Sequence, residues 1–168
     1  WEFAPAGRPH LYPPLYHLLI ALVSRLHGGD LVAAFQDVQC FVLPFAHASV
    51  WWLARWLFGA RRDLATILLA GADPLLAITG MTASPSVLSG AIVVLMVLFF
   101  ASGRWAVAAG LGAVAFYMHT GLIPLAAAGI AVWCLWNREP LRPLAGFLAL
   151  LGLLAAPWAG WLLWHRAW

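Results

Sequence analysis

Long uncharged runs dominate the chain and are separated by short polar breaks. The runs cover residues 9–24, 38–54, 64–72, 74–103, 105–137 and 143–164. A helix needs about 20 apolar residues to cross roughly 30 Å of hydrocarbon. The run 105–137 is too long for one ordinary crossing, so we divide it at Tyr117–Gly121. The run 64–72 extends through Thr79 once Asp73 is included, and Ser84-Pro85-Ser86 favours a fresh helix start.

These breaks predict an all-α fold, a polytopic integral membrane bundle of about six transmembrane helices. The predicted crossings are 37–57, 64–80, 87–102, 105–118, 121–137 and 143–164, and Asp37 is expected at the start of the first. Residues 13–24 are too few to cross, so we predict an interfacial or re-entrant helix there. The chain 1–168 is then a single membrane domain with an extracytoplasmic loop at 1–12, the interfacial helix at 13–24 and a six-helix transmembrane region at 37–164.

The composition leads to the same class. Of 168 residues, 64% are hydrophobic and 9% charged, and the mean hydropathy is +0.90. A soluble domain carries about 25% charged residues, and a core of this size cannot hide so much apolar surface. The arginines are scattered and form no basic stripe, so a nucleic-acid partner is not expected. Cys40 and Cys134 stand alone in apolar runs, which predicts buried side chains and no metal site.

The distribution of arginine predicts the orientation. Six arginines fall on one side of the predicted bundle, namely Arg55, Arg61, Arg62, Arg104, Arg138 and Arg142. The other side receives Arg8, Arg25 and Arg166. Because short cytoplasmic loops are enriched in basic residues, the arginine-rich side is predicted to be cytoplasmic. We therefore expect a multi-pass protein of the plasma membrane with its active face extracytoplasmic.

Two groups on the extracytoplasmic side could bind a phosphate. Arg8, His10 and Tyr12 lie close together in the sequence, and guanidinium and imidazole N–H groups suit a lipid-linked phosphate. The same residues could simply anchor an interfacial helix. His119 lies at a predicted helix junction, where an ionisable residue near membrane depth is functional by default. Its alternative is a hydrogen bond to a neighbouring helix carbonyl.

Four further polar residues are weaker candidates. Asp73 is predicted inside a crossing and could pair with His47 of the preceding one, more as a structural pair than as catalytic groups. Ser84 and Ser86 could bond a sugar hydroxyl or cap a helix.

Ala156 and Gly160 are small residues at the spacing typical of helix packing, so we expect them at a helix contact.

Four short motifs together resemble the membrane part of GT-C glycosyltransferases, especially relatives of protein mannosyltransferases and aminoarabinose transferases. The first is Tyr12-Pro13-Pro14-Leu15-Tyr16 followed by Leu26-His27-Gly28. The others are Leu53-Ala54-Arg55-Trp56-Leu57-Phe58-Gly59, Phe116-Tyr117-Met118-His119-Thr120-Gly121 and Ala155-Ala156-Pro157-Trp158.

The resemblance implies transfer of a sugar, with inversion, from a polyprenyl-phosphate carrier to an acceptor on the extracytoplasmic face. It implies that Arg8, His10, Tyr12 and His119 contact the carrier phosphate, since Tyr12 and His119 stand where many members have lysine. The partners expected are the polyprenyl-phosphate-linked sugar and the lipid bilayer. No cofactor is certain, and a divalent metal remains open. The family's catalytic acid lies upstream of the Pro-Pro element, where this chain has only Glu2, so we expect the chain to be a fragment.

Two other classes stay open at this point. A transporter half would need polar residues along a midplane path and an inverted repeat, for which Asp73 and His47 supply at most one pair. A membrane scaffold without catalytic activity would need neither.

Overall fold

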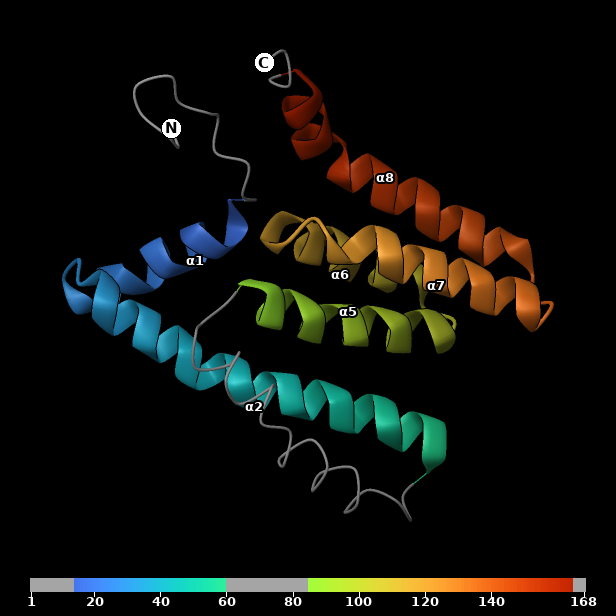
Figure 1. The fold of residues 1–168 in the computed structure, drawn as a ribbon, viewed down its shortest axis with the longest axis horizontal. Helices are drawn as coiled ribbons and strands as arrows, with labels where there is room; N and C mark the ends of the chain where they lie inside the picture. Colours follow the sequence, from blue (N-terminus) through green and yellow to red (C-terminus); the bar gives the residue numbers. More distant parts are fainter. Residues whose placement is uncertain (1–13, 60–84, 165–168) are drawn as a thin grey trace.

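The described part of the chain folds entirely into helices joined by short turns. The computed structural model describes residues 14–59 and 85–164, of which 88% are helical, with no strand among them. The helices, labelled as in Figure 1, are α1 (Leu15–Ser24), α2 (Leu31–Phe58), α5 (Pro85–Ala101), α6 (Trp105–Met118), α7 (Leu122–Trp136) and α8 (Leu141–Trp164), with a short 3₁₀ turn at Arg25–His27. The predicted all-α class is confirmed for these residues.

Most of the predicted breaks coincide with helix ends. The division of 105–137 is correct, because α6 ends at Met118 and α7 begins at Leu122. Helices α5 and α8 begin two residues before the predicted crossings 87–102 and 143–164. The predicted crossing 64–80 lies outside the described residues.

The predicted start of the first long helix is wrong. Helix α2 begins at Leu31, and Asp37 lies in its second turn. The N-cap is Asp30, whose Oδ1 accepts hydrogen bonds from the backbone N–H of Val32 (2.8 Å) and Ala33 (3.1 Å). An aspartate at this position satisfies N–H groups that the first helical turn leaves without partners. The cap therefore starts the helix six residues earlier, at the apolar stretch Leu31–Phe35.

Helix α5 lies in the middle of the assembly. It packs between α2 and α6, α8 covers the outer side of α6, and α7 runs beside α5 (Figure 1). The core lies where α5, α6 and α8 meet, with the Phe100 and Phe147 rings edge to face at 5.2 Å. Gly112 of α6 faces Met96 and Leu151, and a Cβ on this glycine would lie 2.9 Å from the Met96 sulfur. The absence of a side chain at Gly112 thus lets three helices approach closely.

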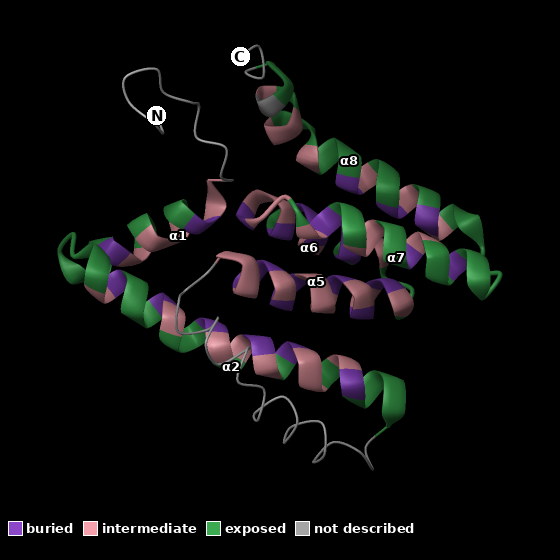
Figure 2. Ribbon diagram, viewed as in Figure 1, coloured by how far each residue is buried: buried purple, intermediate pink, exposed green. Residues whose placement is uncertain are grey.

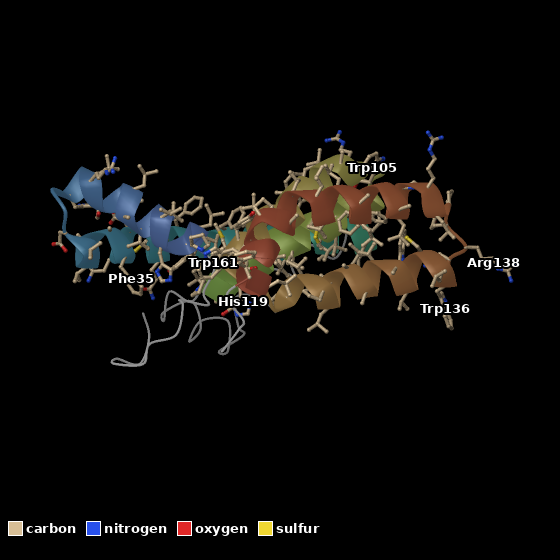
Figure 3. The ribbon with its side chains drawn as sticks, turned by 90° about the horizontal axis from the view of Figure 1, so that it is seen from above. Phe35, Trp105, His119, Trp136, Arg138 and Trp161 are labelled. Carbon is tan, nitrogen blue, oxygen red and sulfur yellow. The ribbon has the colours of Figure 1, made fainter. Side chains whose placement is uncertain are left out.

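The antiparallel course of the helices gives the bundle two chemically different ends. One end holds the last turn of α2 and the turns between α5 and α6 and between α7 and α8, and its charged side chains are Arg55, Arg104, Arg138, Glu139 and Arg142. The turn between α6 and α7, with His119, lies at the opposite end. Figure 3 shows Arg138 and Trp136 far from His119 and Trp161. The arginine end and the His119 end are therefore separated by the length of the bundle.

Helix α1 packs against the first half of α2 as an antiparallel hairpin that extends past the His119 end (Figures 1 and 3). Its tip turns at Gly28 and Gly29, which have φ values of 62° and 97° that favour glycine. Across the tip, the His27 Nε2 and Asp37 Oδ2 atoms lie 2.8 Å apart. Asp37 thus ties the hairpin together. The helix predicted at 13–24 is present as α1, and whether it lies at a membrane interface stays a prediction.

Buried residues follow the inner faces of the helices, and the outer faces are exposed and largely apolar (Figure 2). Two of the described helices, α2 and the Leu141–Trp161 part of α8, are long and apolar enough to cross a membrane. The remaining apolar helices span 10–17 residues.

Two predictions about small residues are wrong. Cys134 is buried as expected, but Cys40 is exposed on α2. Ala156 and Gly160 are also exposed and line no helix contact within the described part of the chain. Close packing instead involves Gly112 and Gly146. A Cβ added at Gly146 would lie 3.1 Å from the Trp105 ring. Spacing alone does not indicate which face of a helix is covered.

Candidate functional site

The turn between α6 and α7 presents the most unusual polar group of the described residues. The backbone N–H of His119 donates to the Ala115 carbonyl (2.8 Å), and the extended backbone of His119 (φ −156°, ψ 105°) then ends α6. The imidazole lies next to Gly121, where a Cβ would approach its Cε1 atom to 3.3 Å. Glycine at position 121 therefore leaves room for the ring.

The Nδ1 atom of His119 is buried and has no hydrogen-bond partner among the described residues. A buried polar atom without a partner costs about 1–3 kcal/mol. The predicted alternative was a hydrogen bond from the His119 ring to a neighbouring helix carbonyl. The Nδ1 atom makes no such bond to a described residue. Within the described part of the chain, this buried atom is therefore left without a hydrogen bond.

Two side-chain hydrogen bonds fix the last turn of α6. The buried Ser89 hydroxyl of α5 donates to the Ala115 carbonyl at 3.0 Å. On the other side, the Tyr117 hydroxyl donates to the Leu154 carbonyl of α8 at 3.3 Å. The turn that holds His119 is thus attached to α5 and to α8. Ser89 could not be singled out from the sequence, because its hydroxyl is one of several small polar groups inside apolar runs.

Tyr16 brings the start of α1 to this end of the bundle. It is 4% exposed and belongs to the core cluster, and α1 contacts α6. Burial raises the pKa of its phenol above the ordinary value of 10.0, so the hydroxyl stays protonated at neutral pH. The predicted phosphate ligands Arg8, His10 and Tyr12 precede α1 and lie outside the described residues.

Of the weaker candidates, the structure describes His47 and Ser86. Asp73 and Ser84 lie outside the described residues, so the proposed pairing of Asp73 with His47 stays a prediction. The His47 Nδ1 atom lies 2.8 Å from the Leu43 carbonyl of its own helix. Ser86 is half-buried in the first turn of α5. No group of three His, Cys, Asp or Glu side chains within residues 14–59 and 85–164 is placed to hold a metal ion.

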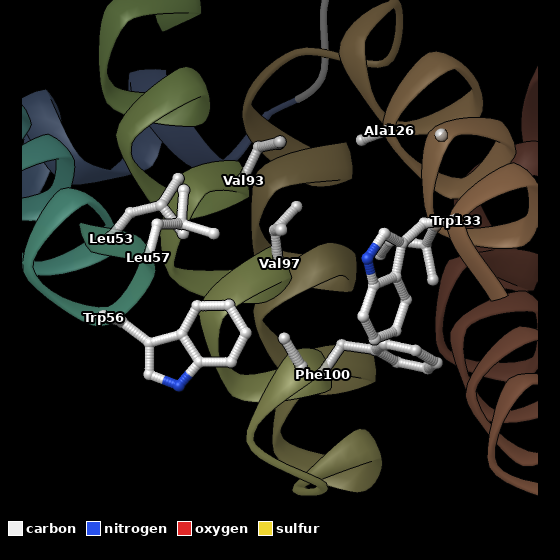
Figure 4. A pocket seen from close by; sticks show the side chains of 11 residues that line it. Leu53, Trp56, Leu57, Val93, Val97, Phe100, Ala126 and Trp133 are labelled. Atoms are coloured by element: carbon white, nitrogen blue, oxygen red, sulfur yellow. The ribbon is translucent and has the colours of Figure 1, made fainter. Parts of the chain in front are cut away.

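An apolar groove lies further into the bundle, and His119 is not among its lining residues. Its volume is about 440 Å³, and it lies between α2 and α7 over α5 (Figure 4). Along α7 it follows Ala126, Gly129, Ile130 and Trp133, which share one face of the helix. Ala126 lies four residues, or about 6 Å, beyond the start of α7 at Leu122. The groove then runs toward the arginine end, where Trp56 and Phe100 line it.

Comparisons of the chain with protein-family models, curated proteins and solved structures found no match. Any functional conclusion therefore rests on the residues and the geometry described above.

Proposed function

We propose that this chain is part of a polytopic membrane glycosyltransferase that binds a polyprenyl-phosphate-linked sugar at its His119 end. The observation that carries the proposal is the buried Nδ1 atom of His119, which has no hydrogen-bond partner among the described residues; an apolar groove along α5 and α7 lies further into the bundle. A polyprenyl-phosphate carrier has a phosphate, which could bond the His119 imidazole, and a long hydrocarbon chain, which could lie along an apolar groove. The resemblance of the sequence motifs to GT-C transferases supports the same substrate class.

Membrane insertion of the whole bundle is part of the proposal. Helices α5, α6 and α7 rise about 25, 21 and 22 Å, less than the roughly 30 Å of a bilayer core, so the bilayer would thin locally around them. Large apolar side chains on the outer faces support a lipid environment, among them Leu26, Trp136 and Trp164, each more than 80% exposed. The arginine end is then cytoplasmic and the His119 end extracytoplasmic.

In the proposed reaction, His119 stabilises the leaving phosphate. The acceptor nucleophile bonds to the anomeric carbon from the face opposite the phosphate, and the carbon–oxygen bond to the phosphate breaks. The electron pair of that bond stays on the phosphate oxygen, where a hydrogen bond donated by the imidazole favours the developing charge. A base takes the acceptor proton.

We assign that base to no described residue. The three carboxylates of the described ranges are Asp30, which caps α2, Asp37, which pairs with His27, and Glu139 at the arginine end.

The proposal is tested by carrier binding to the full-length protein in nanodiscs. We expect His119→Ala to lower the affinity for polyprenyl phosphate at least tenfold, because a hydrogen bond to a charged group contributes about 1.5–3 kcal/mol. His119→Gln keeps an N–H donor and should retain part of the affinity. His27→Ala at the distant hairpin tip is the matched control and should bind as the unaltered protein does. Equal binding by His119→Ala and His27→Ala would refute the proposed role.

A further inference from the structure

A second pocket lies at the arginine end. It shares Trp56 with the apolar groove, but no residue of α7 lines it. Its volume is about 250 Å³, and it lies between the end of α2 and the turn that joins α5 to α6. The lining side chains are Trp52, Trp56, Leu98, Phe99, Ser102 and Arg104. One cation and one hydroxyl thus stand in a wall of aromatic and aliphatic groups.

The turn between α5 and α6 positions the cation. Gly103 has a φ of 78°, and the backbone N–H groups of Gly103 and Arg104 donate to the carbonyls of Phe100 and Phe99, each at 2.9 Å. The Arg104 guanidinium carbon lies 5.9 Å from the centre of the Phe99 ring, and that ring meets Trp52 edge to face at 6.2 Å. The guanidinium therefore lies beside an aromatic ring, and the N–H donors along its edge can bond a ligand.

Arg104 forms no salt bridge with any carboxylate that the structure describes. The surrounding charges are also predominantly positive, since Arg55, Arg138 and Arg142 lie at the same end and Glu139 is the one acid among the described residues there. The Ser102 hydroxyl donates to the Leu98 carbonyl at 2.8 Å, so its oxygen can still accept a hydrogen bond. The pocket offers an anion a fork of donors and offers a ligand hydroxyl one acceptor.

We propose that this pocket binds the phosphodiester headgroup of an anionic glycerophospholipid. Basic pockets between transmembrane helices at the cytoplasmic surface suit anionic headgroups, and an arginine fork matches the phosphate oxygens. Tryptophans such as Trp52 and Trp56 are enriched at headgroup depth, because the apolar ring contacts lipid and the N–H contacts polar groups. The inference depends on membrane insertion with the arginine end cytoplasmic, but not on sugar transfer, because this pocket and His119 lie at opposite ends.

The test uses the full-length protein purified in a neutral detergent and titrated with phosphatidylglycerol, with bound lipid counted by native mass spectrometry. We expect Arg104→Gln to weaken binding about tenfold, because it removes charged hydrogen bonds to the phosphate. Arg142→Gln removes the same charge at the same end without lining this pocket, and it should change the affinity less than twofold. Arg104→Lys keeps the charge but loses the planar fork, so its affinity should fall between the two.

Each other outcome overturns the proposal. Equal losses in Arg104→Gln and Arg142→Gln would mean that the lipid responds to overall charge. Equal binding of phosphatidylcholine would mean that the headgroup charge is not recognised. Displacement of phosphatidylglycerol by inorganic phosphate would mean that the site takes a free anion. If Arg104→Gln does not fold, an unchanged affinity in Arg104→Lys would contradict the role of the fork. Polyprenyl phosphate binding through His119 is measured separately, so either proposal can fail alone.

Discussion

At the scale of single residues, the proposed carrier site depends on His119 and on the hydrogen bonds that hold its turn. A histidine at a helix junction in an apolar chain is conspicuous, because ionisable side chains are expensive near a membrane interior. That its Nδ1 atom is buried without a partner depends on how α5, α6 and α8 close around the turn. The contribution of Ser89 has the same origin, since its bond to the Ala115 carbonyl joins residues 26 positions apart.

Tyr16 makes a testable contribution at this scale. Burial raises its pKa above 10.0, so the folded protein holds the phenolic proton at pH values where the unfolded chain has lost it. The stabilisation is complete below pH 10 and is lost as the pH rises through the folded pKa. We expect the free energy of unfolding to fall as the pH rises above 10 in a detergent-solubilised sample monitored by circular dichroism.

Tyr16→Phe provides the control for that measurement. It removes the ionisable group and keeps the buried ring, so the alkaline fall in stability should become smaller. An identical pH profile for Tyr16→Phe would show that another group causes the loss.

At the scale of elements, the sequence predicted which segments are helical but not how they pack. Breaks in apolar character gave the division between α6 and α7, because His119, Thr120 and Gly121 interrupt the run. The start of α2 was misplaced because Asp37 was expected at the helix start. Asp30 is the cap instead, and the apolar segment Leu31–Phe35 forms the first residues of the helix. The small residues Gly112 and Gly146 determine the close helix contacts, and nothing in the sequence distinguishes them from the exposed Ala156 and Gly160.

Gly112 provides the prediction at this scale. Gly112→Ala adds a Cβ that would lie 2.9 Å from the Met96 sulfur and 3.1 Å from the Leu151 side chain, so these two buried side chains must move from their packed positions. We expect the free energy of unfolding to fall by about 1–3 kcal/mol. Gly110→Ala on the same helix has nothing within 4 Å of the new Cβ and should be neutral or stabilising by up to about 1 kcal/mol. A comparable loss in both variants would contradict the packing of α6.

At the scale of the whole molecule, the alternation of charged and uncharged turns predicted that the arginine turns and the His119 turn lie at opposite ends of the bundle. Neighbouring helices run antiparallel, so the end of α2, the turn from α5 to α6 and the junction of α7 with α8 lie at one end of the bundle. These segments carry Arg55, Arg104, Arg138 and Arg142. The apolar groove could not be predicted, because it is formed by side chains of α2, α5 and α7 that pack without filling the space between them. The site proposed for the carrier phosphate and the site proposed for the phospholipid headgroup follow from this division into two ends.

The central claim is that the His119 junction faces the extracytoplasmic side while the arginine turns face the cytoplasm. We would measure it by labelling single cysteines in intact cells with a membrane-impermeant maleimide, after replacing Cys40 and Cys134. A cysteine at position 120 should react from outside, and addition of polyprenyl phosphate should slow that reaction. A cysteine at position 138 should react only after the membrane is permeabilised. Labelling of position 138 but not of position 120 in intact cells would contradict the account.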